Sequence, residues 1–303
     1  MNSEIISYFT DIVAKDNIYI DELMSRHTTF KTGGPATLFI CPENADEVEK
    51  VAGIVRRLTL PFFVIGNGSN LLVSDKGFDG VVISLEKLAG ITLSCSDRIE
   101  AGAGALNSSI AAFARDNSLT GFEFAAGIPG TIGGAMIMNA GAYDGEMKNI
   151  TKEVRVISPT GEVMVLNGDT MEFGYRTSAI KGRGYIVLSA LLSLEKGSSK
   201  EISEKMTQLA LKRKEKQPLE YPSAGSTFKR PAGFFAGKLI EDAGLRGFSV
   251  GGAQVSEKHC GFVINRGGAT SADIYNLIKE VKKKVYENSG VTLEPEVVMV
   301  GEF

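Results

Sequence analysis

The chain has 303 residues, a length that predicts two or three domains of roughly 100–200 residues each and excludes a peptide-sized module. Hydrophobic residues make up 43% and charged residues 23% of it, an ordinary globular composition that excludes a disordered or low-complexity protein. The formal net charge of −3 gives no overall attraction for nucleic acid or anionic lipid, so we expect local groups to hold any anionic ligand.

The cysteines and histidines show no metal-binding or disulfide pattern. Cys41, Cys95 and Cys260 are far apart and odd in number, and His27 and His259 form no zinc-site spacing, so we expect neither a disulfide framework nor a metal. The first sixteen residues lack the basic and apolar segments of a secretory signal, which predicts a cytoplasmic protein. Residues 124–143 carry no charge, but five glycines and a proline argue against a membrane-spanning helix.

The first third of the chain predicts a strand, a helix and a strand, followed by closely spaced strands. Residues 36–41 and 62–65 have strand composition, and apolar residues between Val48 and Leu58 recur at helical spacing. Asn44 and Glu47 are placed as an N-cap and its reciprocal partner. Four further strands follow, too close together to have a helix between each pair, at residues 71–74, 80–85, 90–95 and 98–103. This order favours an α+β fold over an evenly wound α/β fold.

The remaining two thirds alternate between helices and strands. We expect helices at 108–117, 197–218 and 271–288, and strands at 154–159, 162–167, 185–194 and 291–300. Pro159 and Gly161 predict a turn between the first two of these strands. The charged helix that follows a Gly/Ser turn marks a domain boundary near Ser199.

Two glycine-rich loops could hold a phosphate group. The first, Gly66–Asn70, follows a strand, but Leu71 stands at the sixth position and a strand comes next, so this is not a Rossmann fingerprint. Its main-chain N–H groups could form an anion-binding nest, and a plain hairpin turn stays the alternative. The second loop, residues 127–134, leads into a run compatible with a helix, Ile132–Met138, whose first N–H groups would face a negative charge. Helix packing on Gly133 and Gly134 is the alternative there. Both loops together predict a bound pyrophosphate or dinucleotide.

Eight ordered segments resemble the UDP-N-acetylenolpyruvoylglucosamine reductases, flavoenzymes of bacterial cell-wall precursor synthesis. They are RHTTFKTGG, VIGNGSNLLV, GIPGTIGGAMIMNAGAY, GYRTS, KQPLEYPSAGSTFKRP, AGKLIEDAGLRG, GGAQVSEKHCGFVIN and LEPEV. The chain is similar to the family's shorter class, which lacks an extra tyrosine-bearing loop. The resemblance implies a two-part FAD-binding region of the vanillyl-alcohol-oxidase type (residues 1–87 and 88–199) and a smaller substrate domain (residues 200–303).

The resemblance also implies a reaction and three catalytic residues. NADPH would reduce FAD, and the hydride would pass to the enolpyruvyl group of UDP-N-acetylglucosamine enolpyruvate to give UDP-N-acetylmuramate. Arg176 corresponds to the family's catalytic arginine, Ser226 to its proton donor and Glu296 to its catalytic glutamate, which would need a raised pKa to donate a hydrogen bond. Strand alternation alone puts Glu294 and Glu296 on the same side and does not choose between them.

Binding residues follow from the same match. For FAD they are Gly66, Asn67, Gly68, Ser69, Asn70, Gly130, Thr131, Gly134, Asn139, Ala140 and Gly141. For the substrate they are Tyr175, Lys216, Lys229, Arg230 and His259. We expect no nucleic-acid, membrane or obligate protein partner, and a role in cell shape and division through the cell wall.

Three other functions are weighed against this one. A hydrolase with Ser226 as nucleophile and His259 as base is disfavoured because the segment lacks the GxSxG elbow. An oxidase of the related flavin fold would pass electrons to oxygen instead. A nucleotide-sugar sensor would use the loops for binding without turnover.

Overall fold

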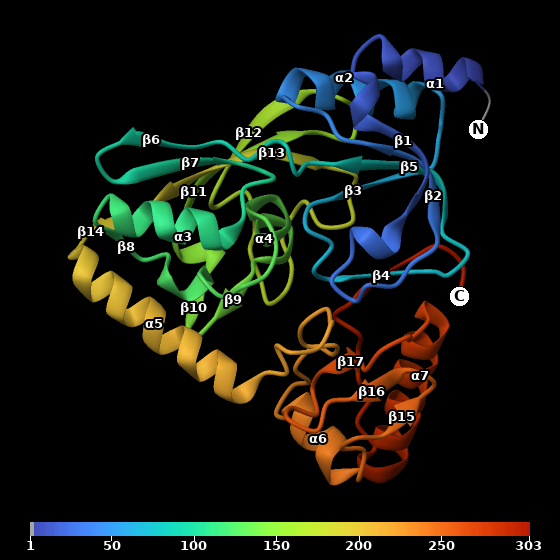
Figure 1. Cartoon of the computed structure of the whole chain (residues 1–303). Helices are drawn as coiled ribbons and strands as arrows, with labels where there is room; N and C mark the ends of the chain where they lie inside the picture. Colours follow the sequence, from blue (N-terminus) through green and yellow to red (C-terminus); the bar gives the residue numbers. More distant parts are fainter. Residues whose placement is uncertain (1–2) are drawn as a thin grey trace. The chain divides into compact units, whose positions relative to one another are not determined.

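A computed structural model describes residues 3–303 (Figure 1). By its internal contacts the chain forms two compact units, and each is assembled from separate stretches of sequence. Unit 1 comprises the chain up to Ile20, Leu38–Asn67 and Gly80–Arg213. Unit 2 comprises Asp21–Thr37, Gly68–Asp79 and Lys214–Phe303. Neither unit is therefore continuous in sequence.

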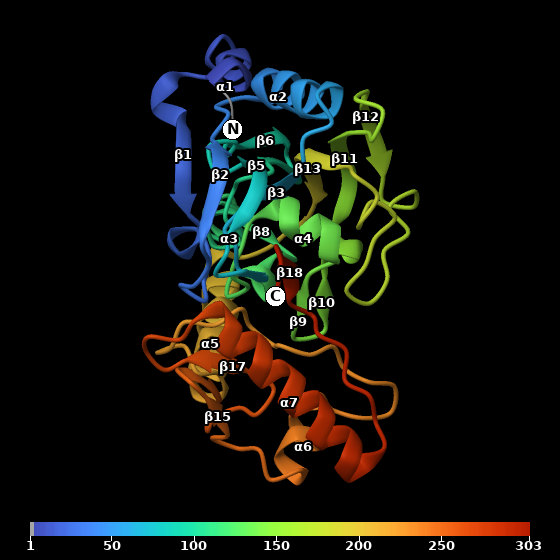
Figure 2. The same cartoon turned by 90° about the vertical axis from the view of Figure 1, so that its right-hand side faces the viewer.

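A four-stranded sheet with two helices opens the fold. Its strand order is β1-β2-β5-β3, and β3 and β5 are parallel. The strands are β1 (Ile18–Leu23), β2 (Pro35–Ile40), β3 (Phe62–Ile65) and β5 (Phe78–Ser84). Helix α1 (Ser3–Thr10) packs against α2 (Ala45–Arg57), and the two lie together in both views (Figures 1 and 2). The predicted strand, helix and strand are confirmed as β2, α2 and β3, with β5 between the two strands in the sheet.

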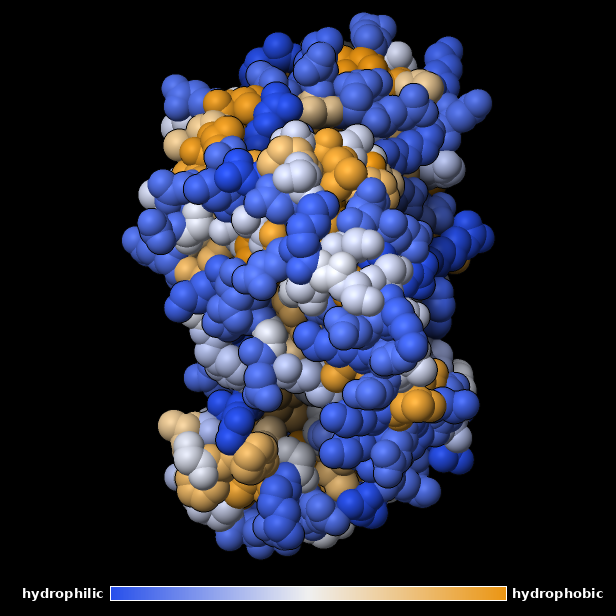
Figure 3. Space-filling model, turned by 90° about the vertical axis from the view of Figure 1, so that its left-hand side faces the viewer, coloured by the Kyte–Doolittle hydropathy of each residue, from blue (hydrophilic) through white to orange (hydrophobic). Residues whose placement is uncertain are grey.

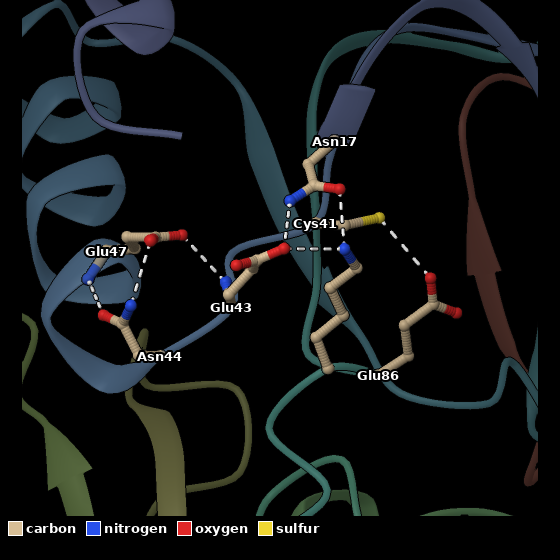
Figure 4. A network of polar contacts seen from close by, with 7 residues as sticks. Asn17, Cys41, Glu43, Asn44, Glu47 and Glu86 are labelled. Atoms are coloured by element: carbon tan, nitrogen blue, oxygen red, sulfur yellow. Dashed lines mark hydrogen bonds and ion pairs between the residues drawn. The ribbon is translucent and has the colours of Figure 1, made fainter. Parts of the chain in front are cut away.

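Helix α2 begins at the residue that the sequence predicts. Asn44 Oδ1 accepts a hydrogen bond from Glu47 N over 3.0 Å. The reciprocal bond goes one residue further back than in a capping box, because Glu47 Oε2 accepts from Glu43 N over 2.8 Å. Figure 4 shows how this cap adjoins a second polar cluster around Asn17 and Glu43. Lys87 Nζ donates to Asn17 Oδ1 over 2.6 Å and to Glu43 Oε1 over 3.0 Å. The two clusters tie the start of α2 to the end of β5.

An antiparallel five-stranded sheet forms the larger part of unit 1. Its strand order is β12-β11-β13-β7-β6. The strands are β6 (Ile91–Cys95), β7 (Arg98–Gly102), β11 (Thr151–Ile157), β12 (Val163–Asn167) and β13 (Ile186–Ser193). Helix α4 (Ile132–Met138) packs against β13 and β7, and its bounds are those of the predicted helical run. The predicted turn between β11 and β12 is present, with Gly161 N bonded to Ser158 O over 3.0 Å.

Short elements complete unit 1. They are α3 (Asn107–Asp116), β8 (Leu119–Thr120), β9 (Gly141–Ala142), β10 (Gly145–Glu146), β14 (Glu195–Lys196) and most of α5 (Ser199–Lys216). The short strand β4 (Leu71–Val73) belongs to unit 2. Of the apolar residues along α5, Ile202 is the one that is fully buried. Glu123, beside β8, is 3% exposed, and its carboxylate accepts from Thr120 Oγ1 at 2.5 Å, Gly121 N at 3.0 Å and Lys205 Nζ at 3.3 Å. Glu123 therefore holds α5 against unit 1.

Unit 2 is a small α+β unit. Its elements are α6 (Ala236–Asp242), β15 (Ser249–Val250), β16 (Ala253–Val255), β17 (Val263–Asn265), α7 (Ser271–Ser289) and β18 (Val298–Val300). Strands β15, β16 and β17 form one antiparallel sheet, and β18 pairs in parallel with β4. The closing strand is shorter than predicted, because residues 291–297 lie outside β18 and pair only through a bridge at Pro295.

Helix α7 has the buried apolar face that its sequence predicts, and its N-terminus is capped. The predicted apolar face is fully buried, at Ile274, Leu277, Ile278, Val281 and Val285. Thr270 and Asp273 form a capping box at the N-terminus. Asp75 adds a second cap, because its two carboxylate oxygens accept from Ser271 N and Ala272 N over 2.8 Å each. An anionic side chain at a helix N-terminus is stabilising.

Each unit has its own hydrophobic core. The core of unit 1 extends from Phe9 to Leu194, and the core of unit 2 joins Phe30 and Leu72 to side chains of α6, α7 and the β15–β17 sheet. The expected separation of residues 1–87 from 88–199 stays a prediction. The face in Figure 3 is largely hydrophilic with small hydrophobic patches. Within residues 3–303 no helix is long and apolar enough to cross a membrane, and no cluster of His, Cys, Asp and Glu has the composition of a metal site.

Candidate active site

The first glycine-rich loop joins strands of two different sheets. It runs from β3 to β4, which pair with β5 and β18 respectively, so it is not the turn of a hairpin. A Cβ on Gly66 would overlap Thr131 Oγ1, and a Cβ on Gly68, which has φ 57°, would overlap His27 O. Both glycines are therefore required by close contacts inside the protein.

The second loop enters α4 through Thr131. Gly130 has φ 115°, which favours glycine, and Thr131 is the N-cap residue. Two N–H groups at the start of α4 are used within the protein, since Ile132 N and Gly133 N donate to Ala105 O and Ala103 O over 2.9 Å each. Gly133 packs against Ala103, as the packing alternative predicts, because a Cβ there would lie 3.0 Å from Ala103 Cβ.

Gly134 is different, and it provides the test of whether a cofactor fits. It is exposed, and a Cβ on it would meet nothing within 4 Å. Neither packing nor backbone conformation requires glycine there, so the missing side chain leaves open space at the first turn of α4. Two buried polar atoms beside the loops, Thr29 Oγ1 and Asn107 Oδ1, have no hydrogen-bond partner among the described residues. The space beside Gly134 would let a dinucleotide approach the main chain closely, and the two polar atoms without partners fit such a polar ligand.

The start of the first loop, at Gly66, meets the second loop within unit 1. The contact between Gly66 and Thr131 joins the end of β3 to the start of α4. Asn107, at the start of α3, supports the second loop from behind, because its N–H donates to Gly130 O over 3.1 Å and its Nδ2 donates to Ile128 O over 3.4 Å. Sequence reasoning missed Asn107, and no local pattern marks it.

Asn139, Ala140 and Gly141 follow α4. The side chain of Asn139 is 1% exposed and bonds only to protein groups among those described: Glu146 Oε2, Gly174 O and Lys148 N at 2.9, 3.1 and 2.9 Å. Ala140 N donates to Ala135 O over 2.9 Å, and Gly141 lies in β9 opposite Glu146. Asn139 therefore shapes the loop from inside the protein.

Arg176 lies in unit 1, in a two-residue turn between Gly174 and Thr177. These two residues form an antiparallel bridge. Arg176 has φ 55°, in the left-handed region that non-glycine residues rarely adopt. Its Nη2 donates to Gly141 O over 3.4 Å, and its guanidinium carbon lies 5.2 Å from the centre of the Tyr175 ring. Tyr175 is 55% exposed. The turn thus places a guanidinium beside β9, which follows α4.

Ser226 and Glu296 both lie in unit 2, on segments that are paired. Glu296 N donates to Thr227 O over 2.8 Å, and Lys229 N donates to Glu294 O over 2.9 Å. Phe228 and Pro295 form the bridge between these two bonds. Ser226 is exposed and Glu296 is half-buried. Two predicted catalytic residues separated by seventy positions in sequence therefore lie on neighbouring, hydrogen-bonded segments.

The remaining predicted substrate residues have various surroundings. Lys216 is exposed at the end of α5. Lys229 forms an ion pair with Glu294 over 2.9 Å, and the Glu294 side chain is 70% exposed. Glu294 therefore differs from Glu296, which is half-buried. Arg230 stacks on Phe235, with its guanidinium carbon 3.9 Å from the ring centre. Lys216 and Arg230 are thus exposed basic side chains, whereas the charge of Lys229 is balanced by Glu294.

His259 is half-buried and packs edge-on against Phe262, with ring centres 5.0 Å apart. Its Nδ1 accepts from Gly261 N over 3.0 Å, which leaves the proton of the neutral ring on Nε2. Burial is the main cause that lowers the pKa of His259 below 6.5. His259 is therefore a neutral donor through Nε2 at physiological pH.

Comparison with known proteins defines the class first. A family model described as an FAD binding domain matches residues 36–167. A glucose oxidase variant of Phl p 4, 12% identical with a TM-score of 0.53, covers 64% of this chain and 44% of that protein, a likeness that concerns the fold alone. The fold and the two loops are those of an FAD-dependent oxidoreductase, and the predicted α+β fold with an FAD-binding region is confirmed. A second family model, described as the UDP-N-acetylenolpyruvoylglucosamine reductase C-terminal domain, matches residues 217–300. The chain belongs to the UDP-N-acetylenolpyruvoylglucosamine reductase family.

Full-length relatives support this membership. The UDP-N-acetylenolpyruvoylglucosamine reductase of Caldanaerobacter subterraneus subsp. tengcongensis is 50% identical over 298 residues, 98% of each chain. That of Clostridioides difficile is 48% identical and covers 99% of each chain. The crystal structure of the Thermus caldophilus UDP-N-acetylenolpyruvylglucosamine reductase has a TM-score of 0.81 at 34% identity, covering 94% of this chain and 100% of that one. The family that the sequence segments predict is confirmed.

Proposed function

We propose that this protein reduces the enolpyruvyl group of UDP-N-acetylglucosamine enolpyruvate to give UDP-N-acetylmuramate, with bound FAD and with NADPH as electron donor. Relatives that are 50% identical over 98% of the chain are named as that reductase. The observation that carries the proposal is the pairing of the Ser226 and Glu296 segments through Glu296 N and Thr227 O. A hydroxyl and a carboxyl on adjoining segments supply the proton and the hydrogen bond that this reduction needs.

The roles of the three catalytic residues follow from the charge that develops. FAD, when bound, supplies the hydride chemistry. As electrons move into the substrate carboxylate, the planar guanidinium of Arg176 holds that group with two hydrogen bonds and stabilises the added charge. Glu296, with its carboxyl protonated, donates a hydrogen bond to the same charge. The hydroxyl of Ser226 gives its proton to the carbon of the enolpyruvyl double bond that does not receive the hydride.

The binding residues form two sets. We propose that FAD contacts Gly66, Asn67, Gly68, Ser69, Asn70, Gly130, Thr131, Gly134, Asn139, Ala140 and Gly141. Main-chain N–H groups and the open face of Gly134 support the first set. We propose that the substrate contacts Tyr175, Lys216, Lys229, Arg230 and His259. Lys229 would share its charge between Glu294 and the ligand, because it already forms an ion pair.

The wider setting belongs to the same proposal. The division into residues 1–87, 88–199 and 200–303 would give two parts that hold FAD and one that holds the substrate. The reaction would take place in the cytoplasm, where NADPH is available as a reductant. As a step in peptidoglycan precursor synthesis, it would support cell shape and division.

Anaerobic half-reactions on the FAD-loaded protein test the proposal. NADPH should bleach the flavin absorbance, and UDP-N-acetylglucosamine enolpyruvate should then restore it, with one UDP-N-acetylmuramate formed per flavin reoxidised as measured by mass spectrometry. In a parallel run in air, reoxidation by oxygen but not by the substrate would make the protein an oxidase. Binding of the UDP-sugar without any reoxidation would make it a nucleotide-sugar sensor. Either result overturns the proposed reaction.

A further inference from the structure

The turn that carries Arg176 has a strained main chain. At φ 55°, Arg176 is in a conformation that costs a non-glycine residue free energy and persists only where neighbouring groups hold it. Inside the turn, Gly174 N donates to Thr177 O over 3.1 Å and Thr177 N donates to Gly174 O over 3.2 Å. Two such bonds close a two-residue turn, and the second holds the N–H of the peptide group after Arg176. The carbonyl of that peptide group is held from outside the turn.

Lys181 makes the first contact from outside the turn. Its ammonium Nζ donates to the main-chain O of Arg176 over 2.8 Å, and the side chain is half-buried. A hydrogen bond from a charged donor is shorter and stronger than one between neutral groups. Because the bond ends on the carbonyl of the strained residue itself, it fixes the second polar atom of the peptide that follows Arg176, whose N–H already donates to Gly174 O. The orientation of that peptide in turn sets the direction of the arginine side chain.

Asn139 makes the second contact, at the other end of the turn. Its Nδ2 donates to Gly174 O over 3.1 Å, and its Oδ1 accepts from Lys148 N over 2.9 Å. Asn139 itself has φ 45°, in the conformation that ends α4. Among non-glycine residues, asparagine is one of the few that adopt this conformation readily. One residue therefore ends the helix after the second glycine-rich loop and anchors the turn of Arg176.

Ser178 adds a third anchor on the same segment. Its Oγ donates to Ile137 O over 2.8 Å, and it is 7% exposed. The side chain of Arg176 reaches Gly141 O, four residues along from Ile137. The segment of the turn is thus hydrogen-bonded to the end of α4 at two points, through Ser178 to Ile137 O and through the Arg176 side chain to Gly141 O.

We infer that Lys181 and Asn139 are positioning residues for Arg176, which hold its turn in the left-handed conformation that aims the guanidinium. Neither residue needs to touch the substrate for this. The expected effect of Lys181 on turnover rests on the proposed function. The expected effect of Lys181 on the conformation of the turn is independent of that function.

Lys181→Met tests the inference directly, because it keeps the length of the side chain and removes the ammonium. We expect the rate of flavin reduction by NADPH to stay within about twofold of wild type. The reoxidation rate with UDP-N-acetylglucosamine enolpyruvate should fall on the order of 10²-fold, as expected for a misplaced catalytic group. Lys181→Arg retains a cationic donor and should recover most of that loss. Lys196→Met, on the exposed strand β14, is the matched control and should behave as wild type.

Asn139→Gly separates the side-chain bonds from the backbone conformation. Glycine adopts a positive φ without cost, so α4 can still end as it does, but the bond to Gly174 O is lost. Amide hydrogen exchange, followed by mass spectrometry on a peptide covering residues 172–181, gives a readout independent of activity. In both Lys181→Met and Asn139→Gly we expect faster exchange at this peptide, with unchanged exchange in α7.

A double-mutant comparison distinguishes positioning from a general structural effect. In an Arg176→Ala background, adding Lys181→Met should slow reoxidation by less than threefold, because there is no guanidinium left to aim. A full additional loss would overturn the inference. So would wild-type exchange and wild-type reoxidation in Lys181→Met. If the unaltered protein shows no reoxidation by the substrate, the proposed function fails, and the exchange result alone decides whether Lys181 holds the turn.

Discussion

The side-chain amide of Asn70 donates a hydrogen bond to the main-chain carbonyl of Glu296 over 3.1 Å. In the other direction, Val298 N donates to Asn70 O over 2.9 Å. The last residue of the first glycine-rich loop is therefore fixed to the segment that carries the proposed catalytic carboxyl. The pairing of β4 with β18 continues from these two bonds. Asn70 thus has a second role beside the cofactor contact predicted for it.

Replacing Asn70 should affect the Glu296 segment. In Asn70→Ala we expect slower flavin reoxidation by the substrate and a loss of about 1 kcal/mol in the free energy of unfolding, the usual value of one hydrogen bond. Asn70→Asp, which puts an acceptor against the carbonyl, should lose as much. Stopped-flow absorbance and urea unfolding measure the two effects. Weaker FAD binding with an unchanged reoxidation rate would show that the amide serves only the cofactor.

Ser226→Ala should slow one half of the catalytic cycle. Removing a general acid typically costs ~10²- to 10⁴-fold, so we expect that loss in flavin reoxidation and nearly none in flavin reduction by NADPH. Because Ser226 is exposed, the unfolding midpoint should not change. Ser96→Ala, at an exposed serine between β6 and β7, is the control. Equal losses in both half-reactions would exclude the proton-donor role.

Glu123 should make the stability of unit 1 depend on acid pH. Burial raises its pKa, but hydrogen bonds from Thr120 and main-chain N–H groups and the charge of Lys205 outweigh this and lower it below 4.5. The carboxylate therefore contributes stability above pH 4.5, and this is lost as the pH falls through the lower, folded-state pKa. Glu123→Gln should cost about 2 kcal/mol at neutral pH and much less in strong acid.

Urea unfolding at a series of pH values measures the effect of Glu123. The exposed Glu204→Gln, on α5, is the matched control and should follow the wild-type curve. A constant difference between Glu123→Gln and wild type at every pH would show that packing, not charge, is responsible.

His259 should make the protein less stable as the pH falls, whereas a histidine paired with a carboxylate makes a protein more stable as the pH falls. Its folded-state pKa lies below 6.5 mainly because burial disfavours the charged ring. Between that lower pKa and 6.5 the unfolded chain binds more protons, so stability falls as the pH drops through this range. His259→Asn keeps an acceptor for Gly261 N and cannot titrate, so it should remove this dependence. Thermal unfolding between pH 5 and 8 tests it, and an unchanged slope would contradict the assignment.

Local signals predicted α2 and α7 well because each has a marked start and a buried face, whereas α1 and α6 were not predicted. Asn44 marks the start of α2, and the five apolar residues of α7 are all buried. The last strand was overestimated, because Pro295 cannot donate to a sheet and the chain before Val298 pairs through isolated bonds. The sequence could not show this, since the partner of that segment is at Phe228.

The predicted site residues are those that lie in family motifs. Residues that act through tertiary hydrogen bonds were missed. Arg176, Ser226 and Glu296 come from the resemblance, and the pairing of the last two supports it without showing their roles. Lys181 and Asn107 were missed because their importance lies in the carbonyls that they reach, Arg176 O and Ile128 O. Such tertiary hydrogen bonds leave no periodic or spaced pattern in the sequence.

The assembly of unit 2 from three stretches has a consequence for synthesis of the protein. Phe30 and Leu72 belong to its core, and β4 pairs only with β18 among the described strands. On the ribosome, these early residues emerge long before α7 and β18 exist. Their apolar side chains stay unburied until α7 and β18 have also left the ribosome, so unit 2 can be completed only after the residues of β18 have emerged.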